Sequence, residues 1–268
     1  MGGYMSLMND KKNIIYQKYG WKRDLPDKRD YLVKFTDFIL ESPIPKKIDL
    51  REKCPEIYDQ GVLGSCTANA IGFLYQYDEL KQNVLTKFRP SRLFIYYNER
   101  EIQGNIDHDC GSSLRDGMKT INKLGVCSEE MWDYDITKYQ IKPTDDCYSF
   151  ANLHKSIKYS KLSQKEILLK TCLNNGYPFV FGISIYESFE SEDVSKNGVV
   201  PIPSKNEKLL GGHAMAAVGY DDEIDCFIVR NSWGVNWGIN GYCYIPYKYI
   251  TDPYLANDFW KLEKIKDF

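Results

Sequence analysis

The stretch that decides how this chain folds is residues 60–66, Gln-Gly-Val-Leu-Gly-Ser-Cys. Its two glycines allow a tight turn. A helical pattern begins at the cysteine, because Ile71, Leu74 and Tyr75 follow with the i, i+3, i+4 spacing of one helix face. A thiol at the start of a helix lies at the positive end of the helix dipole, which favours the thiolate. Cys66 is therefore predicted to be a nucleophile, and the alternative is a buried structural cysteine.

A second segment supplies a candidate partner for the thiol. A thiol nucleophile needs a base or a cationic neighbour, and one imidazole serves as both. The chain has three histidines. Only His213 opens an apolar strand behind two glycines, where its ring would lie at the wall of a cleft. His108 lies in an acidic turn and His154 near a linker, so both are predicted to be solvated.

A third segment, residues 231–234, reads Asn-Ser-Trp-Gly. The side-chain oxygen of Asn231 is suited to accept a hydrogen bond from one ring nitrogen of a histidine and so to fix the ring. Trp233 would cover that bond from water, which strengthens it. The alternative is a core aromatic residue at an ordinary turn.

The composition is that of a soluble globular protein. The chain has 268 residues, a net charge of −2, 43% hydrophobic residues and 27% charged residues. These values exclude a disordered chain and a strongly basic nucleic-acid binder, so no nucleic acid partner is expected. No run of about 18 apolar residues exists, so no membrane span is expected. The first residues lack the apolar stretch of a signal peptide.

The order of the predicted elements indicates an α+β fold with two lobes. The first half reads mainly as helices and the second mainly as strands, and the boundary is expected near residues 143–156. The expected domains are an N-terminal extension (1–44), a helical lobe (45–150) and a β-rich lobe (151–268). Helices are predicted at 66–80, 91–100, 113–124 and 163–173, the last opened by a capping box at its first four residues, and strands at 179–185, 213–220, 226–230 and 241–245.

Together, the three segments resemble the papain family of cysteine peptidases, in its cathepsin-like form. That family has Gln-Gly-x-Cys-Gly-Ser-Cys-Trp at the nucleophile, a His before a small-apolar strand, and Asn-Ser-Trp-Gly-x-x-Trp-Gly. From Cys66 to His213 is 213 − 66 = 147 residues, within the ~130–150 expected. The resemblance begins near Pro45. It implies a two-lobed fold with a helical N-terminal lobe, a β-barrel-like C-terminal lobe and a cleft between them.

The resemblance also implies a role for each residue of the site. Cys66 would attack the peptide carbonyl and form a thioester, His213 would transfer the proton, and Asn231 would orient His213. Gln60 would form the oxyanion hole with the backbone N–H of Cys66. The implied function is a cysteine endopeptidase that needs no cofactor and no metal. The alternatives are a non-catalytic binding protein with this fold and an acyl transferase using the same nucleophile.

Five residues are expected to bind the peptide or protein substrate: Gly64, Ser65, Gly111, Gly212 and Trp233. Gly111 lies where the family has a glycine-rich stretch whose backbone pairs with extended substrate, and a bare backbone permits that approach. The alternative is a simple helix N-cap just after it. A His-His pair would indicate trimming of dipeptides from C-termini, and its absence favours endopeptidase action.

The cysteines and two departures from the family pattern bear on stability. None of the eight cysteines forms a C-x-x-C pair, so a zinc ribbon is not expected. Residues 107–110, Asp-His-Asp-Cys, are interpreted as a polar turn and not as a metal site. Leu63 replaces the first family cysteine, which removes one disulfide and favours a reducing compartment. Thr67 replaces the aromatic residue after the nucleophile, which is expected to loosen the packing there.

The N-terminal extension, residues 1–44, is the last unexplained part. We hypothesise that it is an autoinhibitory pro-segment that crosses the cleft through its aromatic stretch, residues 16–31. The alternative is a surface arm that stays bound permanently.

Overall fold

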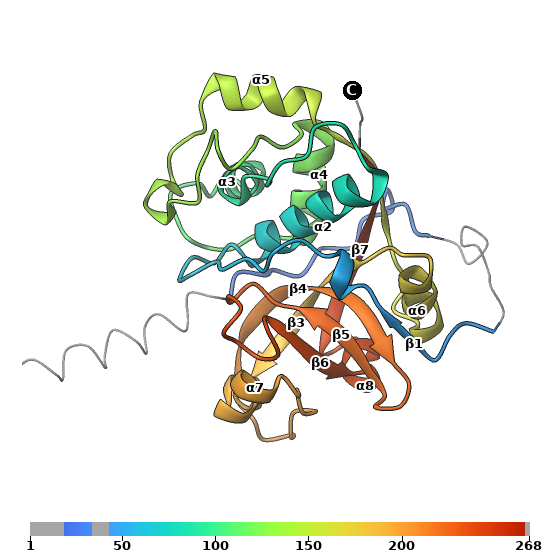
Figure 1. The fold of residues 1–268 in the computed structure, drawn as a ribbon. Coiled ribbons are helices and arrows are strands. Elements are labelled where there is room, and N and C mark those ends of the chain that lie inside the picture. The colour runs from blue at the N-terminus through green and yellow to red at the C-terminus, as the bar shows by residue number, and fades with distance from the viewer. Residues whose placement is uncertain (1–18, 34–42, 266–268) are drawn as a thin grey trace, which may run out of the picture.

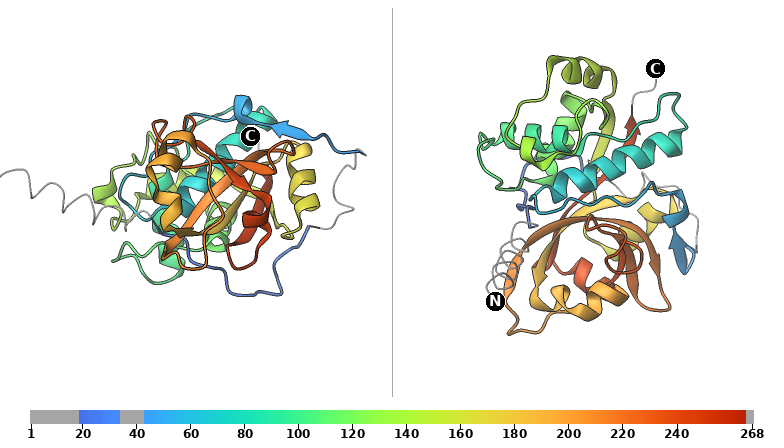
Figure 2. Two further views of the ribbon diagram at one scale, coloured as in Figure 1. Left: turned by 90° about the horizontal axis from the view of Figure 1, so that it is seen from below. Right: turned by 60° about the vertical axis from the view of Figure 1, so that its left-hand side comes forward.

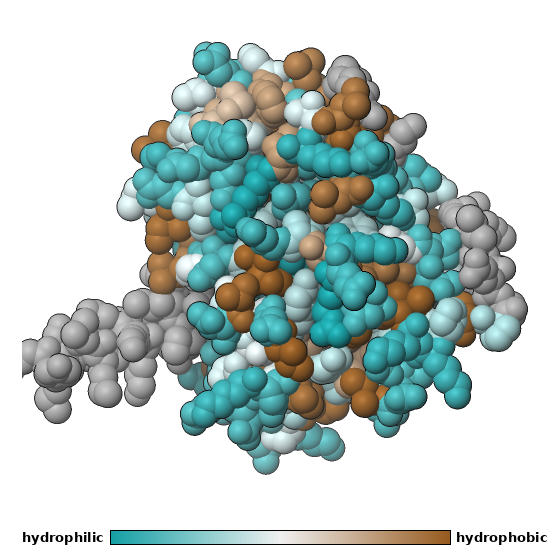
Figure 3. All heavy atoms as spheres, viewed as in Figure 1, coloured by the Kyte–Doolittle hydropathy of each residue, from teal (hydrophilic) through white to brown (hydrophobic). Residues whose placement is uncertain are grey.

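The computed structural model describes residues 19–33 and 43–265, and it has the expected α+β architecture (Figure 1). Helices α2 to α5 gather on one side of the molecule, and most of the sheet lies on the other, flanked by α6, α7 and α8. None of the described helices is both long and apolar enough to cross a membrane. The face shown in Figure 3 is mostly hydrophilic, with hydrophobic residues in small separate groups.

The helices are α2 (Cys66–Gln82), α3 (Arg92–Ile102), α4 (Leu114–Lys123), α5 (Asp145–Leu153), α6 (Glu166–Asn174), α7 (Glu192–Asn197) and α8 (Tyr247–Thr251), with 3-10 turns η2 (Arg51–Lys53), η3 (Ile136–Lys138) and η4 (Glu187–Glu190). The strands are β1 (Lys47–Asp49), β2 (Ser156–Lys161), β3 (Phe179–Tyr186), β4 (Leu209–Asp221), β5 (Cys226–Arg230), β6 (Tyr242–Pro246) and β7 (Ala256–Ile265).

The three predicted helices of the first half are confirmed as α2, α3 and α4. Ser91 and Ser113 cap α3 and α4, because each side chain accepts a hydrogen bond from a backbone N–H in the first turn. The predicted capping box before α6 is wrong. That helix begins only at Glu166, after Lys165, which makes no side-chain cap. Gln164 instead donates to two carbonyls outside the helix, those of Ile250 and Ala256.

The strands form one antiparallel sheet in the order β2-β7-β3-β4-β5-β6, with β1 paired to β4. The expected barrel-like lobe is therefore a curved sheet whose ladder, over the described residues, does not close (Figure 2). Sequence analysis missed β1, β2 and β7. The strand β1 comes from the first half of the chain but belongs to the sheet. The division into 1–44, 45–150 and 151–268 remains a prediction.

The long helix α2 joins the two sides of the molecule. It packs against α3 and α4 on one side and against β4 and β7 on the other, and Figure 2 shows it along the boundary. Residues from Cys66 to Tyr75 of this helix are all buried. The first turn of α2 is therefore held between helices and sheet, and β4 runs beside it.

A pair of glycines tests how tightly the helical side is packed. Gly104 and Gly125 both have a positive φ, 67° and 88°, so an alanine at either position costs about 1–2 kcal/mol of left-handed strain. A Cβ at Gly104 would meet nothing within 4 Å, whereas one at Gly125 would lie 1.7 Å from the Ala151 carbonyl oxygen. We expect Gly125→Ala to lose about 1–3 kcal/mol more unfolding free energy than Gly104→Ala, measured in urea. Equal losses would contradict this packing.

Candidate active site

Cys66 is the first residue of α2, and its side chain is fully buried. Backbone groups of Ala214 and Gly20 lie within hydrogen-bond reach of its sulfur. Ala214 follows His213 in β4, so the helix and the sheet meet at the predicted nucleophile and its predicted partner. Gly20 belongs to the N-terminal extension. The thiol is therefore enclosed by three separate parts of the chain.

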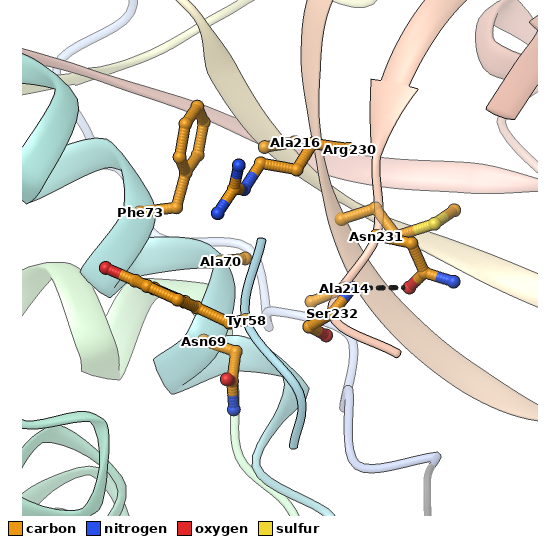
Figure 4. A pocket seen from close by; sticks show the side chains of 10 residues that line it. Tyr58, Asn69, Ala70, Phe73, Ala214, Ala216, Arg230, Asn231 and Ser232 are labelled. Atoms are coloured by element: carbon orange, nitrogen blue, oxygen red, sulfur yellow. Dashed lines mark hydrogen bonds between the residues drawn. The ribbon is translucent and has the colours of Figure 1, made fainter. Parts of the chain in front are cut away.

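His213 and Asn231 are joined by a hydrogen bond in which His213 Nε2 donates to Asn231 Oδ1 at 2.8 Å. The antiparallel pairing of β4 with β5 ends at Ala216 opposite Arg230, so Asn231 follows beside Met215. His213 lies two residues along β4, on the same face of the strand as Met215. Asn231 Oδ1 also accepts the backbone N–H of Ser232 at 2.8 Å, as Figure 4 shows. The Trp233 ring lies over His213, with ring centroids 4.9 Å apart. The asparagine oxygen thus holds the imidazole in one orientation.

Gln60 is buried between the loop that precedes α2 and the segment after β5. Its side-chain oxygen accepts from Ser232 Oγ at 2.6 Å, and its side-chain nitrogen donates to the Leu63 carbonyl at 2.9 Å. Its backbone N–H donates to the Ser232 carbonyl at 2.9 Å. The structure thus joins Gln60 to the segment that follows Asn231 and to the loop that leads to Cys66.

The state of the thiol differs from the expectation drawn from sequence. Burial raises the pKa of Cys66 to about 12, although backbone N–H groups of Ala214, Gly20 and Thr67 favour the thiolate. The loss of hydration at the buried sulfur therefore outweighs the stabilising effect of the helix N-terminus on the thiolate. The predicted thiolate is not favoured in this closed form. Thr67 does not loosen the packing either. It is fully buried, and its hydroxyl donates to the buried Glu99 at 2.7 Å.

The described part of the N-terminal extension, residues 19–33, is called the strap below. It passes through the site with the backbone of Gly20 close to the backbones of Gly64 and Gly111. A Cβ on Gly20 would lie 1.7 Å from the Gly64 carbonyl oxygen, and one on Gly111 would lie 1.9 Å from the Gly20 carbonyl oxygen. Ser112 N–H donates to the Gly20 carbonyl at 2.7 Å, and Lys22 N–H donates to the Ser112 carbonyl at 2.8 Å. These contacts require glycine at positions 20 and 111.

Side chains of the strap fill the two sides of the site. The Trp21 indole lies against Gly182 of β3, where a Cβ would come within 1.8 Å of the ring. The backbone N–H of Trp21 donates to the Gly212 carbonyl at 3.0 Å. The Tyr19 ring lies edge-on to His213 and Trp233, with centroid distances of 6.3 and 6.2 Å. Sequence analysis did not find Gly182, because nothing in a strand pattern marks one glycine as a contact.

Four of the five predicted substrate-binding residues, Gly64, Gly111, Gly212 and Trp233, contact the strap or lie beside its side chains. Ser65 has other partners. It is buried, and its hydroxyl is hydrogen-bonded to Tyr134 at 2.5 Å and to Asn69 at 3.0 Å. Ser65 therefore holds the loop in front of Cys66 and does not face the strap through its side chain.

Asp109 ties the same loop to a neighbouring one. Its carboxylate accepts the backbone N–H of Gly64 at 3.0 Å and the Tyr96 hydroxyl at 2.5 Å. The Tyr96 oxygen in turn accepts the backbone N–H of Gly111 at 3.1 Å. All eight cysteines are free thiols, so hydrogen bonds and not a disulfide join these loops. The described residues contain no group of three or more His, Cys, Asp or Glu that could hold a metal.

Beyond the cleft, the strap is anchored by buried charges that sequence analysis missed. Asp24 accepts from the Trp260 indole at 2.9 Å, and its backbone N–H donates to Asp258 at 2.7 Å. Arg115 pairs with Asp30 at 2.6 Å. The sequence shows a run of charges here, which indicates a solvated segment, and only the fold places body residues against it.

Comparison with known proteins shows the family. Residues 44–250 match the family described as papain family cysteine protease. The "Uncharacterized peptidase C1-like protein L477" of Acanthamoeba polyphaga mimivirus is 44% identical, over 95% of this chain and 89% of its own length. Cathepsin B-like CP3 of Giardia intestinalis is 26% identical, over 80% of this chain and 73% of its own.

Solved structures agree with the sequence relatives. Xylellain, a cysteine protease from Xylella fastidiosa, superposes with a TM-score of 0.86 at 41% identity, covering 94% of this chain and 97% of its own. Procathepsin B S9 of Trypanosoma congolense shares the fold, with a TM-score of 0.70 at 20% identity, covering 87% of this chain and 82% of its own. The family match, the mimivirus relative and xylellain each span most of the sequence. The chain is therefore a cysteine peptidase of the papain family.

Proposed function

We propose that this peptidase is an endopeptidase that works through a thioester formed on Cys66. The observation that carries the proposal is the His213–Asn231 hydrogen bond of 2.8 Å, beside a thiol at the start of α2. No cofactor is needed for this chemistry.

The expected reaction follows from the arrangement of these groups. His213 takes the proton of Cys66, and the sulfur attacks the peptide carbonyl. The backbone N–H of Cys66 and the side chain of Gln60 stabilise the oxyanion. His213 then gives its proton to the leaving amine, and water hydrolyses the thioester. For Gln60 to act, its side-chain nitrogen has to exchange the Leu63 carbonyl for the oxyanion.

A labelling experiment separates an enzyme from a binding protein. We expect an epoxide probe to label Cys66 covalently, faster in Trp21→Ala than in the wild type because the strap covers the thiol, and Cys66→Ala to abolish both labelling and cleavage of a fluorogenic peptide. Cys54→Ala is the matched control, because Cys54 is a half-buried free thiol at the end of η2, outside the cleft. Unchanged cleavage by Cys66→Ala would contradict the proposal. Product analysis with added amine tests the acyl-transferase alternative.

We further propose that the strap is an intramolecular inhibitor. The part of a substrate after the cut bond must lie against His213, which protonates the leaving amine, and the part before it pairs with the Gly111 wall. In the strap, Tyr19 lies at His213, whereas Lys22 pairs with Ser112. The strap therefore runs in the direction opposite to a substrate, so its own peptide bonds do not meet Cys66 in a reactive orientation.

The packing of Trp21 against Gly182 gives a direct test of inhibition. Trp21→Ala leaves an unfilled space against Gly182 and should open the cleft, so we expect peptide cleavage by the full chain to rise at least about tenfold. Leu25→Ala is the matched control, because Leu25 is in the same strap but 80% exposed. Equal kcat/KM values for Trp21→Ala and the wild type would indicate a surface arm and not an inhibitor.

The buried carboxyls under the strap predict a pH dependence. Burial, with the nearby Asp24, raises the pKa of Asp258 from 3.8 to about 6. Because the closed form holds this proton more tightly than an open form would, closure takes up protons, and the closed form loses stability as the pH rises from about 4 to about 6. Inhibition by the strap should therefore be stronger at pH 4.5 than at pH 7.

Asp258→Asn provides the measurement, because an amide cannot titrate and resembles the protonated acid. We expect the ratio of wild-type to Asp258→Asn kcat/KM to be at least several-fold higher at pH 7 than at pH 4.5. A ratio that does not change with pH would contradict the role of this carboxyl. The ratio is used because it removes the pH dependence of catalysis itself.

We also propose that the protein works in a reducing compartment. The eight free thiols need no oxidation for the fold to form, and a reducing compartment would keep Cys66 active.

A further inference from the structure

The strap shows which groups line the part of the cleft that receives the leaving side of a substrate. This step rests on the proposed function, because it assigns that side from the proton that His213 must deliver. Tyr19 occupies this position, with its ring against His213 and Trp233. Its hydroxyl donates a hydrogen bond to the carboxylate of Glu190. Tyr19 therefore occupies this subsite in the way that a substrate side chain would.

The floor of this subsite is a rigid aromatic group. Trp233 is 8% exposed, and Phe189 packs edge-on to it at 5.7 Å. Phe189 is 1% exposed and also stacks on Trp237 at 5.7 Å. Phe189 thereby fixes η4, the turn that ends at Glu190. The Glu190 carboxylate is thus held beside an apolar floor. One tyrosine side chain spans the gap between this carboxylate and His213.

Neighbouring acidic residues have other partners. Glu187 accepts the backbone N–H of Lys208 at 3.4 Å, and Glu192 pairs with Lys196 at 2.5 Å. Glu190 lies at the rim, half-buried, and its carboxylate accepts the hydroxyl of the strap tyrosine. When the strap leaves, the carboxylate of Glu190 remains at the edge of the open subsite.

We propose that Glu190 is a specificity-determining residue, which selects peptides that carry a long side chain ending in a hydrogen-bond donor directly after the cut bond. Tyrosine, lysine and arginine meet this description. Their apolar stems would lie on Trp233, and their donors would reach the carboxylate. An acidic side chain would face a like charge, and phenylalanine would fill the floor without satisfying Glu190.

The test uses the full chain and four internally quenched peptides that differ only in the residue after the cut bond: tyrosine, phenylalanine, lysine or glutamate. The measured quantity is the ratio of kcat/KM between two peptides for the same enzyme. The strap closes the cleft to all four alike, so its occupancy cancels in each ratio. We expect the wild type to favour tyrosine over phenylalanine by about fivefold and lysine over glutamate by about thirtyfold.

Three variants assign the preference to one carboxylate. In Glu190→Gln the charge is lost, so the lysine-to-glutamate ratio should fall to within about threefold of one, while part of the tyrosine preference remains. In Glu190→Leu the acceptor is lost as well, and the tyrosine-to-phenylalanine ratio should fall to about one. Glu192→Gln is the matched control, with the same loss of charge two residues away, and should keep both wild-type ratios.

The outcomes separate this inference from the proposed function. Cleavage of all four peptides at equal rates by the wild type would overturn the role of Glu190 and leave an endopeptidase. Wild-type ratios that persist in Glu190→Leu would do the same. Absence of cleavage of any peptide, also in the Trp21→Ala background, would overturn the endopeptidase proposal and the inference with it.

Discussion

The antiparallel register of β4 and β5 is the constraint on which the site depends. It pairs Ala216 with Arg230, so Asn231 comes beside Met215, and its side chain reaches His213 two residues along the same face of β4. Arg230 itself faces the helical side of the molecule, where it donates to the Pro55 carbonyl at 2.7 Å and lies over the Phe73 ring at 4.6 Å. Figure 4 shows Arg230 reaching toward α2 while Asn231 turns away from it. Two successive residues thus join the halves and orient the imidazole.

The closed cleft and the neutral thiol have one cause. The strap backbone comes so close to Gly64 and Gly111 that water is excluded from Cys66. Exclusion of water raises the pKa of the thiol to about 12, although the start of α2 favours the thiolate. Removal of the strap would return water to the sulfur and let the helix and His213 act on it. The cover therefore blocks access and also suppresses the reactivity of the nucleophile.

The loop before Cys66 is held without covalent bonds. Leu63 stands where the resemblance expects a cysteine, and the carboxylate of Asp109, supported by Tyr96, binds the next backbone N–H instead. A carboxylate that accepts a backbone N–H makes one of the stronger kinds of hydrogen bond. Because this tie needs no oxidation, it forms equally well with all cysteines reduced.

Local patterns made part of the fold predictable. The helices α2, α3 and α4 show apolar periodicity, and serine caps begin α3 and α4. The strands β3, β4 and β5 are rich in β-branched and aromatic residues. The strand β7 was missed because Asn257, Asp258, Lys261 and Glu263 interrupt its apolar pattern. Lys261 is nonetheless 3% exposed and pairs with Glu263 at 2.5 Å. The start of α6 was misplaced because distant carbonyls of Ile250 and Ala256 engage Gln164.

The sequence by itself determined the family, the α+β class and the predicted roles of Cys66, His213, Asn231 and Gln60, because these depend on residue types in a fixed order along the chain. Only the tertiary structure decided which residues face one another across the cleft. The seat of Trp21 on Gly182, the contact of Tyr19 with Glu190 and the buried pair of Asp24 and Asp258 join segments more than 150 residues apart. The physical reason is that burial and the approach of distant backbones, which set the pKa of a thiol or the room for an indole, are properties of the packed chain and leave no local pattern.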